Sequence, residues 1–213
     1  MAAAHFELPS FLIMICRFLY YQLYPDSPIP SSDLSVVAYP QIHQRISIFY
    51  NMTAVFCTPS DASGITGMRH EYIQATPSWR GGRARYDTIF INMGPEIAIG
   101  LWGLEVARVM AFFSFVHEGR KYQSALIHWF SRVGAELDEN TGLWVVKPDF
   151  NNDGHPHLAI IHINTIYCGA HLIPVYCSAR TIHRSLTMHD SLDVFRQFYV
   201  NKFIDYHAFH IVC

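Results

Sequence analysis

The chain has 213 residues, of which 51% are hydrophobic and only 15% are charged. This composition excludes a disordered tail, because so apolar a chain can bury a large core. The formal net charge of −2 argues against tight non-specific DNA binding by the whole chain, since free-standing DNA-binding domains are usually strongly basic.

The first predicted element is an amphipathic or buried helix over residues 6–24, which ends at the proline-rich stretch that starts at Pro25. Arg17 and Gln22 interrupt its apolar residues, and the uninterrupted apolar run 11–16 is far shorter than the ~20 residues that span a bilayer. No lysine or arginine precedes that run, as a signal peptide would require. We therefore expect no membrane partner, and a membrane-associated segment is the less favoured alternative.

The middle of the chain is rich in short strand signals, where apolar residues alternate or β-branched and aromatic residues cluster. Strands are predicted over residues 45–50, 53–56, 86–92, 105–116, 121–130, 143–147 and 157–164, whereas residues 69–75 are ambiguous. Glu118-Gly119, between two of these runs, predicts a β-hairpin. The strands follow one another too closely for crossover helices, so we expect an antiparallel barrel or sandwich over residues 76–188.

The last predicted element is a helix over residues 191–208, which Asp190 or Ser191 could cap. Apolar residues from Leu192 to Phe203 recur at helical spacing along one stripe of it. The tail is therefore expected to close the β-rich part of the chain.

Together these elements predict an α+β fold that is mainly an antiparallel β-barrel or sandwich, with an N-terminal helix and a C-terminal helix. Residues 1–75 are expected to form a helix and an extended lead-in segment, and residues 76–213 a β-rich C-terminal domain closed by the helix.

The cysteines and histidines do not match a known metal site. The five cysteines are odd in number and form no CxxC pair, which argues against structural zinc and against a disulfide framework. The nearest metal-like grouping has a spacing that fits no standard zinc finger, and consists of Cys168, His171, Cys177 and His183. We therefore expect no metal, no cofactor and reduced thiols, which favour a nuclear or cytoplasmic location.

No catalytic residue can be assigned from motifs. The acids that could hold two Mg²⁺ ions in a nuclease site are Asp87, Glu105, Asp149 and Asp153. Such a site would need a mixed α/β core whose helices this chain lacks, so solvated loop acids are expected instead. Residues 149–154 also copy half of a calcium-binding loop, but Ile160 takes the place of its final glutamate, and a hairpin turn is predicted.

The one basic cluster is WRGGRAR at residues 79–85. Its candidate nucleic-acid-binding residues are Trp79, Arg80, Arg83 and Arg85. The arginines could contact phosphates while the indole stacks on a base. The alternative is a solvated loop whose tryptophan is anchored in the core. Motifs for nucleotide binding and for a serine nucleophile do not occur.

Long and unusual strings occur at residues 142–150 (GLWVVKPDF), 191–195 (SLDVF) and 198–209 (FYVNKFIDYHAF). Through them the chain resembles the C-terminal region of Plavaka-type fungal transposase-like proteins, in the Kyakuja–Dileera–Zisupton group. The resemblance covers most of the chain and is strongest after residue 75.

The resemblance implies that strand-transfer chemistry belongs to an acidic triad upstream of the matched region, so no catalytic residue is carried over. It implies a non-catalytic accessory or interaction region of a transposase-derived protein, in the form of a truncated remnant without the catalytic core. The partners would be DNA, chromatin proteins or the missing transposase core. The alternatives are a stand-alone chromatin- or nucleic-acid-binding module, and part of a metal-dependent DNA-cleaving transposase whose triad lies upstream.

Overall fold

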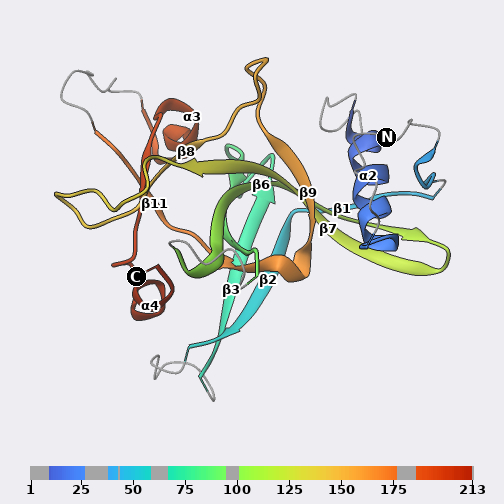
Figure 1. The fold of residues 1–213 in the computed structure, drawn as a ribbon, viewed down its shortest axis with the longest axis horizontal. Coiled ribbons are helices and arrows are strands. Elements are labelled where there is room, and N and C mark those ends of the chain that lie inside the picture. The colour runs from blue at the N-terminus through green and yellow to red at the C-terminus, as the bar shows by residue number, and fades with distance from the viewer. Residues whose placement is uncertain are drawn as a thin grey trace.

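The computed structural model describes residues 10–26, 38–42, 44–58, 67–94, 101–176 and 186–212. These residues form an α+β fold in which a large antiparallel sheet curls into a half-barrel (Figure 1). The predicted fold class is therefore confirmed, including a helix near each end of the chain. In the described part of the chain, no helix is both long and apolar enough to cross a membrane.

The elements follow one another as mostly short strands between terminal helices. The helices are α2 (Phe11–Leu23), α3 (Ser191–Val194) and α4 (Tyr206–Val212). The strands are β1 (Ser47–Phe49), β2 (Asn51–Cys57), β3 (Met68–Thr76), β4 (Arg85–Tyr86), β5 (Thr88–Asn92), β6 (Leu104–His117), β7 (Arg120–Arg132), β8 (Val145–Pro148), β9 (Leu158–His162), β10 (Ile166–Gly169), β11 (Leu172–Pro174) and β12 (Phe198–Val200). Short 3-10 turns precede β6, β10 and α3, and are η4 (Leu101–Gly103), η5 (Ile163–Thr165) and η6 (Met188–Asp190).

The long hairpin of β6 and β7 is the centre of the sheet. His117 pairs with Arg120, so the connecting turn consists of Glu118 and Gly119 alone. Both have positive φ, at 49° and 78°, as the type I′ turn requires. This turn twists in the same sense as the strands that it joins, and the predicted hairpin is confirmed.

The sheet runs in the order β10-β5-β6-β7-β8-β12-β11, while β1 pairs with β6 and β9 pairs with β7. The first part of β6 pairs with β5 and its later part with β1, and the register shifts between Val109 and Ala111. Such bulges bend a strand and increase its twist, and this one lies between the part of β6 that pairs with β5 and the part that pairs with β1. A smaller sheet, β2-β3-β4, packs beside β6 and β10.

Two hydrophobic clusters hold the fold together. In the larger, the β2–β3 hairpin contributes Phe56 and Ile73, which pack with central strand residues such as Val106 and with Phe198. In the smaller, α2 covers the outer part of the β6–β7 hairpin, and the ring centroids of Phe11 and Phe113 lie 5.3 Å apart. Figure 1 shows α2 beside this hairpin, with α3 and α4 at the opposite end of the molecule.

The predicted N-terminal helix is confirmed where the structure describes it, since α2 spans Phe11–Leu23, and residues 6–9 lie outside the described residues. Ambiguous residues 69–75 belong to β3. Strands β1 and β12 extend the sheet beyond the expected range 76–188. The division at residue 75 stays a prediction, although β3 runs across it and the larger cluster draws on both sides.

The continuous helix predicted over residues 191–208 is wrong. Helix α3 ends at Val194, β12 follows, and α4 begins only at Tyr206. Phe198 and Val200 are fully buried while the residue between them is not, which is the period-two pattern of a strand. A short apolar run of this kind fits both the helical period of apolar residues and the strand period of two. Pairing with β8 and β11 makes this run a strand.

Candidate functional site

The basic loop at residues 79–85 is a tight turn between β3 and β4. The Gly82 amide donates to the Trp79 carbonyl at 2.9 Å, and the Trp79 amide donates to the Arg83 carbonyl at 2.9 Å. Arg80 and Gly81 have positive φ, at 51° and 74°. The backbone is therefore that of a hairpin turn.

Two arginines of this loop lie over the same indole ring. The guanidinium carbons of Arg80 and Arg85 are 5.2 and 4.9 Å from the centre of Trp79. These distances are typical of cation–π contacts. Trp79 is half-buried and belongs to neither hydrophobic cluster, so the alternative of a core anchor is not supported.

Carboxylates pair with two of the three positive charges of the loop, Arg83 and Arg85. Arg83 forms an ion pair with Asp190, and Arg85 donates to Asp87 from Nε at 2.7 Å and from Nη2 at 3.2 Å. Hydrogen bonds from the hydroxyl and amide of Thr187, together with Arg83, hold the pKa of Asp190 below its usual range. A phosphate would have to compete with these carboxylates. Within the described ranges, Arg80 has no such partner.

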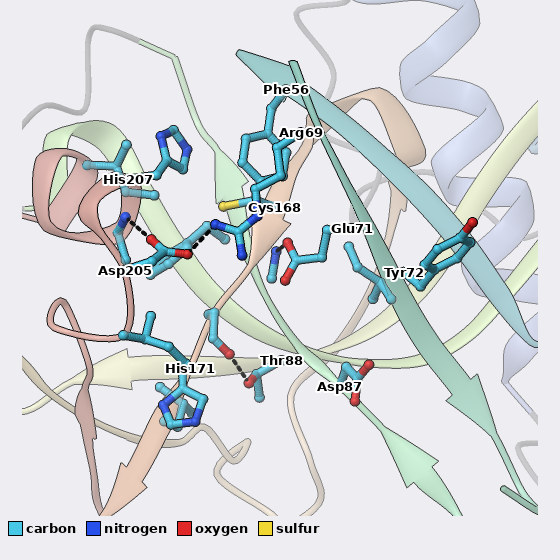
Figure 2. Close-up of a pocket in the computed structure, with 18 of the residues that line it drawn as sticks. Phe56, Arg69, Glu71, Tyr72, Asp87, Thr88, Cys168, His171, Asp205 and His207 are labelled. Carbon is cyan, nitrogen blue, oxygen red and sulfur yellow. Dashed lines mark hydrogen bonds and ion pairs between the residues drawn. The ribbon is translucent and has the colours of Figure 1, made fainter. Parts of the chain in front are cut away.

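A second candidate site is a cavity of about 370 Å³ between the β2–β3 hairpin, β10 and α4. Figure 2 shows Arg69, Cys168, Asp205 and His207 gathered on one side of it, with Asp87 on the other. Among the described residues, charged, thiol and imidazole groups converge here in a way that the sequence did not indicate. The cavity therefore has the composition of a possible catalytic site, and its geometry decides whether it is one.

Each carboxylate of the cavity is engaged by the fold itself. Glu71 accepts a hydrogen bond from the Gly169 amide at 2.7 Å, and Asp87 accepts one from the Gln74 amide at 2.8 Å. Asp205 accepts from Arg69 at 2.5 Å and from the Ala208 amide at 2.7 Å. These bonds join strands and a helix end, so each acid that lines the cavity also satisfies a backbone donor of the fold.

Gly169 leaves room for the Glu71 carboxylate at one of these junctions. A Cβ at this position would lie 2.6 Å from one carboxylate oxygen of Glu71. Its φ does not lie in the left-handed region, so a larger residue would have to displace the Glu71 carboxylate but would not strain the backbone. The close approach lets β10 present its amide directly to β3.

Cys168 and His207 do not form an activated nucleophile. Burial, assisted by the negative charges of Glu71 and Asp205, raises the pKa of the Cys168 thiol well above its usual range. Burial also lowers the pKa of His207, although the Asp205 carboxylate opposes the change. The imidazole stacks on Phe56 with ring centres 4.8 Å apart. A reactive cysteine needs a lowered pKa, which is the opposite of what this environment produces.

The acids considered as nuclease ligands lie in separate contacts, and Glu105 is half-buried on β6 and not in the solvated loop that was expected. Glu105 faces Arg132 at 3.7 Å, with its pKa raised by burial, and Asp149 contacts the Nδ1 of His157 at 2.7 Å. In the described part of the chain, no three histidines, cysteines or acids converge as a metal site. Of the proposed zinc grouping, Cys177 and His183 lie outside the described residues.

The predicted hairpin turn at residues 149–154 is confirmed. The Asn151 amide donates to His155 at 2.8 Å and the Gly154 amide donates to Asn151 at 2.9 Å. Phe150 and Pro156 form an isolated antiparallel bridge above this turn.

Sequence patterns could not have identified the cavity, because its residues come from distant segments. Arg69 and Glu71 share one face of β3 only if the ambiguous segment is a strand. Asp205 and His207 lie at the end of the continuous helix predicted over residues 191–208, which the structure divides into α3, β12 and α4. Comparison with protein-family models, curated proteins and solved structures finds no match.

Proposed function

We propose that the chain is a non-catalytic interaction region of a transposase-derived protein. The observation that carries the proposal is that Glu71, Asp87 and Asp205 all bond to backbone amides, two of them also to arginine side chains. A general acid or base must instead be free to exchange a proton with a substrate. The protonated thiol of Cys168 supports the same reading. The resemblance to Plavaka-type proteins supplies the transposase origin.

The proposed partners are DNA, chromatin proteins or the rest of a transposase. We place the protein in the nucleus or cytoplasm, in keeping with the free thiols of Cys16, Cys57 and Cys168.

A DNA-cleavage assay tests the non-catalytic role. The purified chain is incubated with supercoiled plasmid DNA and Mg²⁺ or Mn²⁺, beside the variants Glu71→Gln and Asp87→Asn. We expect no nicking or strand joining that depends on these carboxylates. Nicking by the wild-type chain that either substitution abolishes would overturn the proposal, because it would place the acids in a metal-dependent site.

A stand-alone nucleic-acid-binding module is a second candidate, and the stack of Arg80 and Arg85 on Trp79 favours it. Such a platform could hold a base beside phosphate-binding cations. The carboxylates of Asp87 and Asp190 and the chain's net charge of −2 make weak, salt-sensitive binding the expected form.

Anisotropy titration of a labelled single-stranded oligonucleotide at two salt concentrations tests this candidate. The joint substitution Arg80→Ala, Arg83→Ala and Arg85→Ala should lower both the affinity for the oligonucleotide and the salt dependence of that affinity. The control substitution Arg120→Ala with Lys121→Ala lies at the tip of the β6–β7 hairpin. It should leave the loop's contribution to binding unchanged. Asp190→Asn should raise affinity, because it releases Arg83 from its ion pair. If the triple variant binds as the wild type does, the loop is not the interface.

A further inference from the structure

A larger, mainly apolar groove lies between the β7–β8 part of the sheet and α3. Its volume is about 740 Å³, within the range of ligand pockets. Phe130 and Pro148 line it from the sheet, Leu192 and Val194 from α3, and Phe150 from the turn that follows β8. We call it the α3 groove.

Two apolar side chains of the α3 groove are exposed to solvent. Phe150 is 54% exposed and Val194 is 46% exposed. The ring of Phe150 is held in place, since it meets His128 edge-on with ring centres 5.5 Å apart, and His128 in turn bonds the Asp149 carbonyl at 2.7 Å. An exposed apolar surface that is already fixed can bind a partner with little loss of conformational freedom.

The charges that line the groove do not balance. Three cations, Arg108, Lys147 and Arg196, face two carboxylates, Asp149 and Asp193. Asp193 is bound by Arg108 at 2.5 Å.

The remaining carboxylate is also engaged, because Asp149 is bound by His157 at 2.7 Å. Lys147 and Arg196 therefore have no carboxylate partner within the described ranges. Both are exposed, and both lie at the same end of the β8–β12 ladder, in which Val146 pairs with Phe198.

We propose that the α3 groove binds a short protein segment in which apolar side chains stand next to aspartate or glutamate. The apolar side chains would cover Phe150 and Val194, and the acid would pair with Lys147 and Arg196. This inference rests on the proposed interaction role and names the partner's chemistry.

A nucleic acid fits the same groove less well than an acidic peptide. Its phosphates follow one another at regular spacing and would meet Asp149 and Asp193 as well as the two cations. A peptide can place a single acid at the cationic end and apolar side chains along the rest of the groove.

The test uses an array of short fluorescein-labelled peptides, each with leucine or phenylalanine flanked by aspartate or glutamate. Each is paired with a counterpart in which lysine replaces the acids. We expect at least one acidic peptide to bind about tenfold more tightly than its lysine counterpart, as two exposed ion pairs would allow. Lys147→Glu with Arg196→Glu should invert that preference, and Phe150→Ser should weaken binding of both members of the pair.

Arg120→Glu with Lys121→Glu is the matched control, since it reverses two exposed cations at the far hairpin tip. Unchanged unfolding midpoints show that each variant is folded. The proposal is overturned if no acidic peptide binds, if both counterparts bind equally, or if the Lys147 and Arg196 reversal changes nothing. Oligonucleotide binding that this reversal abolishes would assign the groove to nucleic acid instead. None of these outcomes alters the cleavage assay, so the proposed function stands or falls separately.

Discussion

Arg69 on β3 and Asp205, the residue before α4, join their side chains at 2.5 Å across 136 positions of sequence. The second oxygen of Asp205 accepts the Ala208 amide at 2.7 Å. One carboxylate therefore caps α4 and docks it on the β2–β3 hairpin. Helix α4 lines the cavity between the β2–β3 hairpin and β10, so this ion pair connects the C-terminal helix to that cavity.

Replacing Asp205 should separate its two roles. Asp205→Ala removes both the cap and the ion pair, and we expect it to lower the free energy of unfolding by about 1–2 kcal/mol. Asp205→Asn keeps a capping oxygen and loses only the charge, so its cost should stay below about 1 kcal/mol. Urea denaturation of both variants measures the difference. Equal losses would show that the cap contributes nothing.

Stability should fall in mild acid because of the half-buried imidazole of His207. Its pKa is lower in the folded chain than in the unfolded chain, so protons favour unfolding. This contribution is complete above about pH 6.5 and is lost as pH falls toward the folded value. His207→Phe keeps the stack on Phe56 and should flatten the decline measured by denaturation between about pH 7 and pH 5.

Part of that decline should persist in His207→Phe, because burial also lowers the pKa values of His128 and His171. An unaltered profile in His207→Phe would contradict the assignment to His207.

The turn between β6 and β7 should respond in opposite directions to two substitutions. Glu118→Asn should stabilise the chain by roughly 0.5 kcal/mol, because asparagine adopts positive φ more readily than glutamate. Gly119→Ala should cost about 1 kcal/mol. A Cβ there would meet no neighbour within 4 Å, so backbone conformation alone explains the loss. Thermal denaturation checks both signs, and stabilisation by Gly119→Ala would rule out the type I′ geometry.

Two cysteines should differ sharply in reactivity. Cys57 is exposed, whereas Cys168 is 3% exposed and its pKa is raised by burial. Iodoacetamide should modify Cys57 in the folded chain and Cys168 only in denaturant, since the thiolate is the reactive form. Peptide mapping by mass spectrometry gives the order. Early modification of Cys168 would show that the cavity opens readily.

The candidate site shows where sequence reasoning stops. The four residues of the basic loop were identified by composition, and the structure places Trp79 with Arg80 and Arg85 as a stack. The ion pair of Arg83 with Asp190 was not predictable, because it joins positions 107 residues apart. No local sequence pattern indicates that Asp190 will lie beside Arg83.

Local sequence determined those elements whose conformation depends on neighbouring residues. The Glu118-Gly119 hairpin, the apolar face of α2 and the turn at residues 149–154 follow from turn chemistry and periodicity. Tertiary structure alone decided residues 198–200, which became a strand because β8 and β11 supply its hydrogen bonds. It also assembled the cavity and the α3 groove, since their side chains come from segments that only the curled sheet brings together.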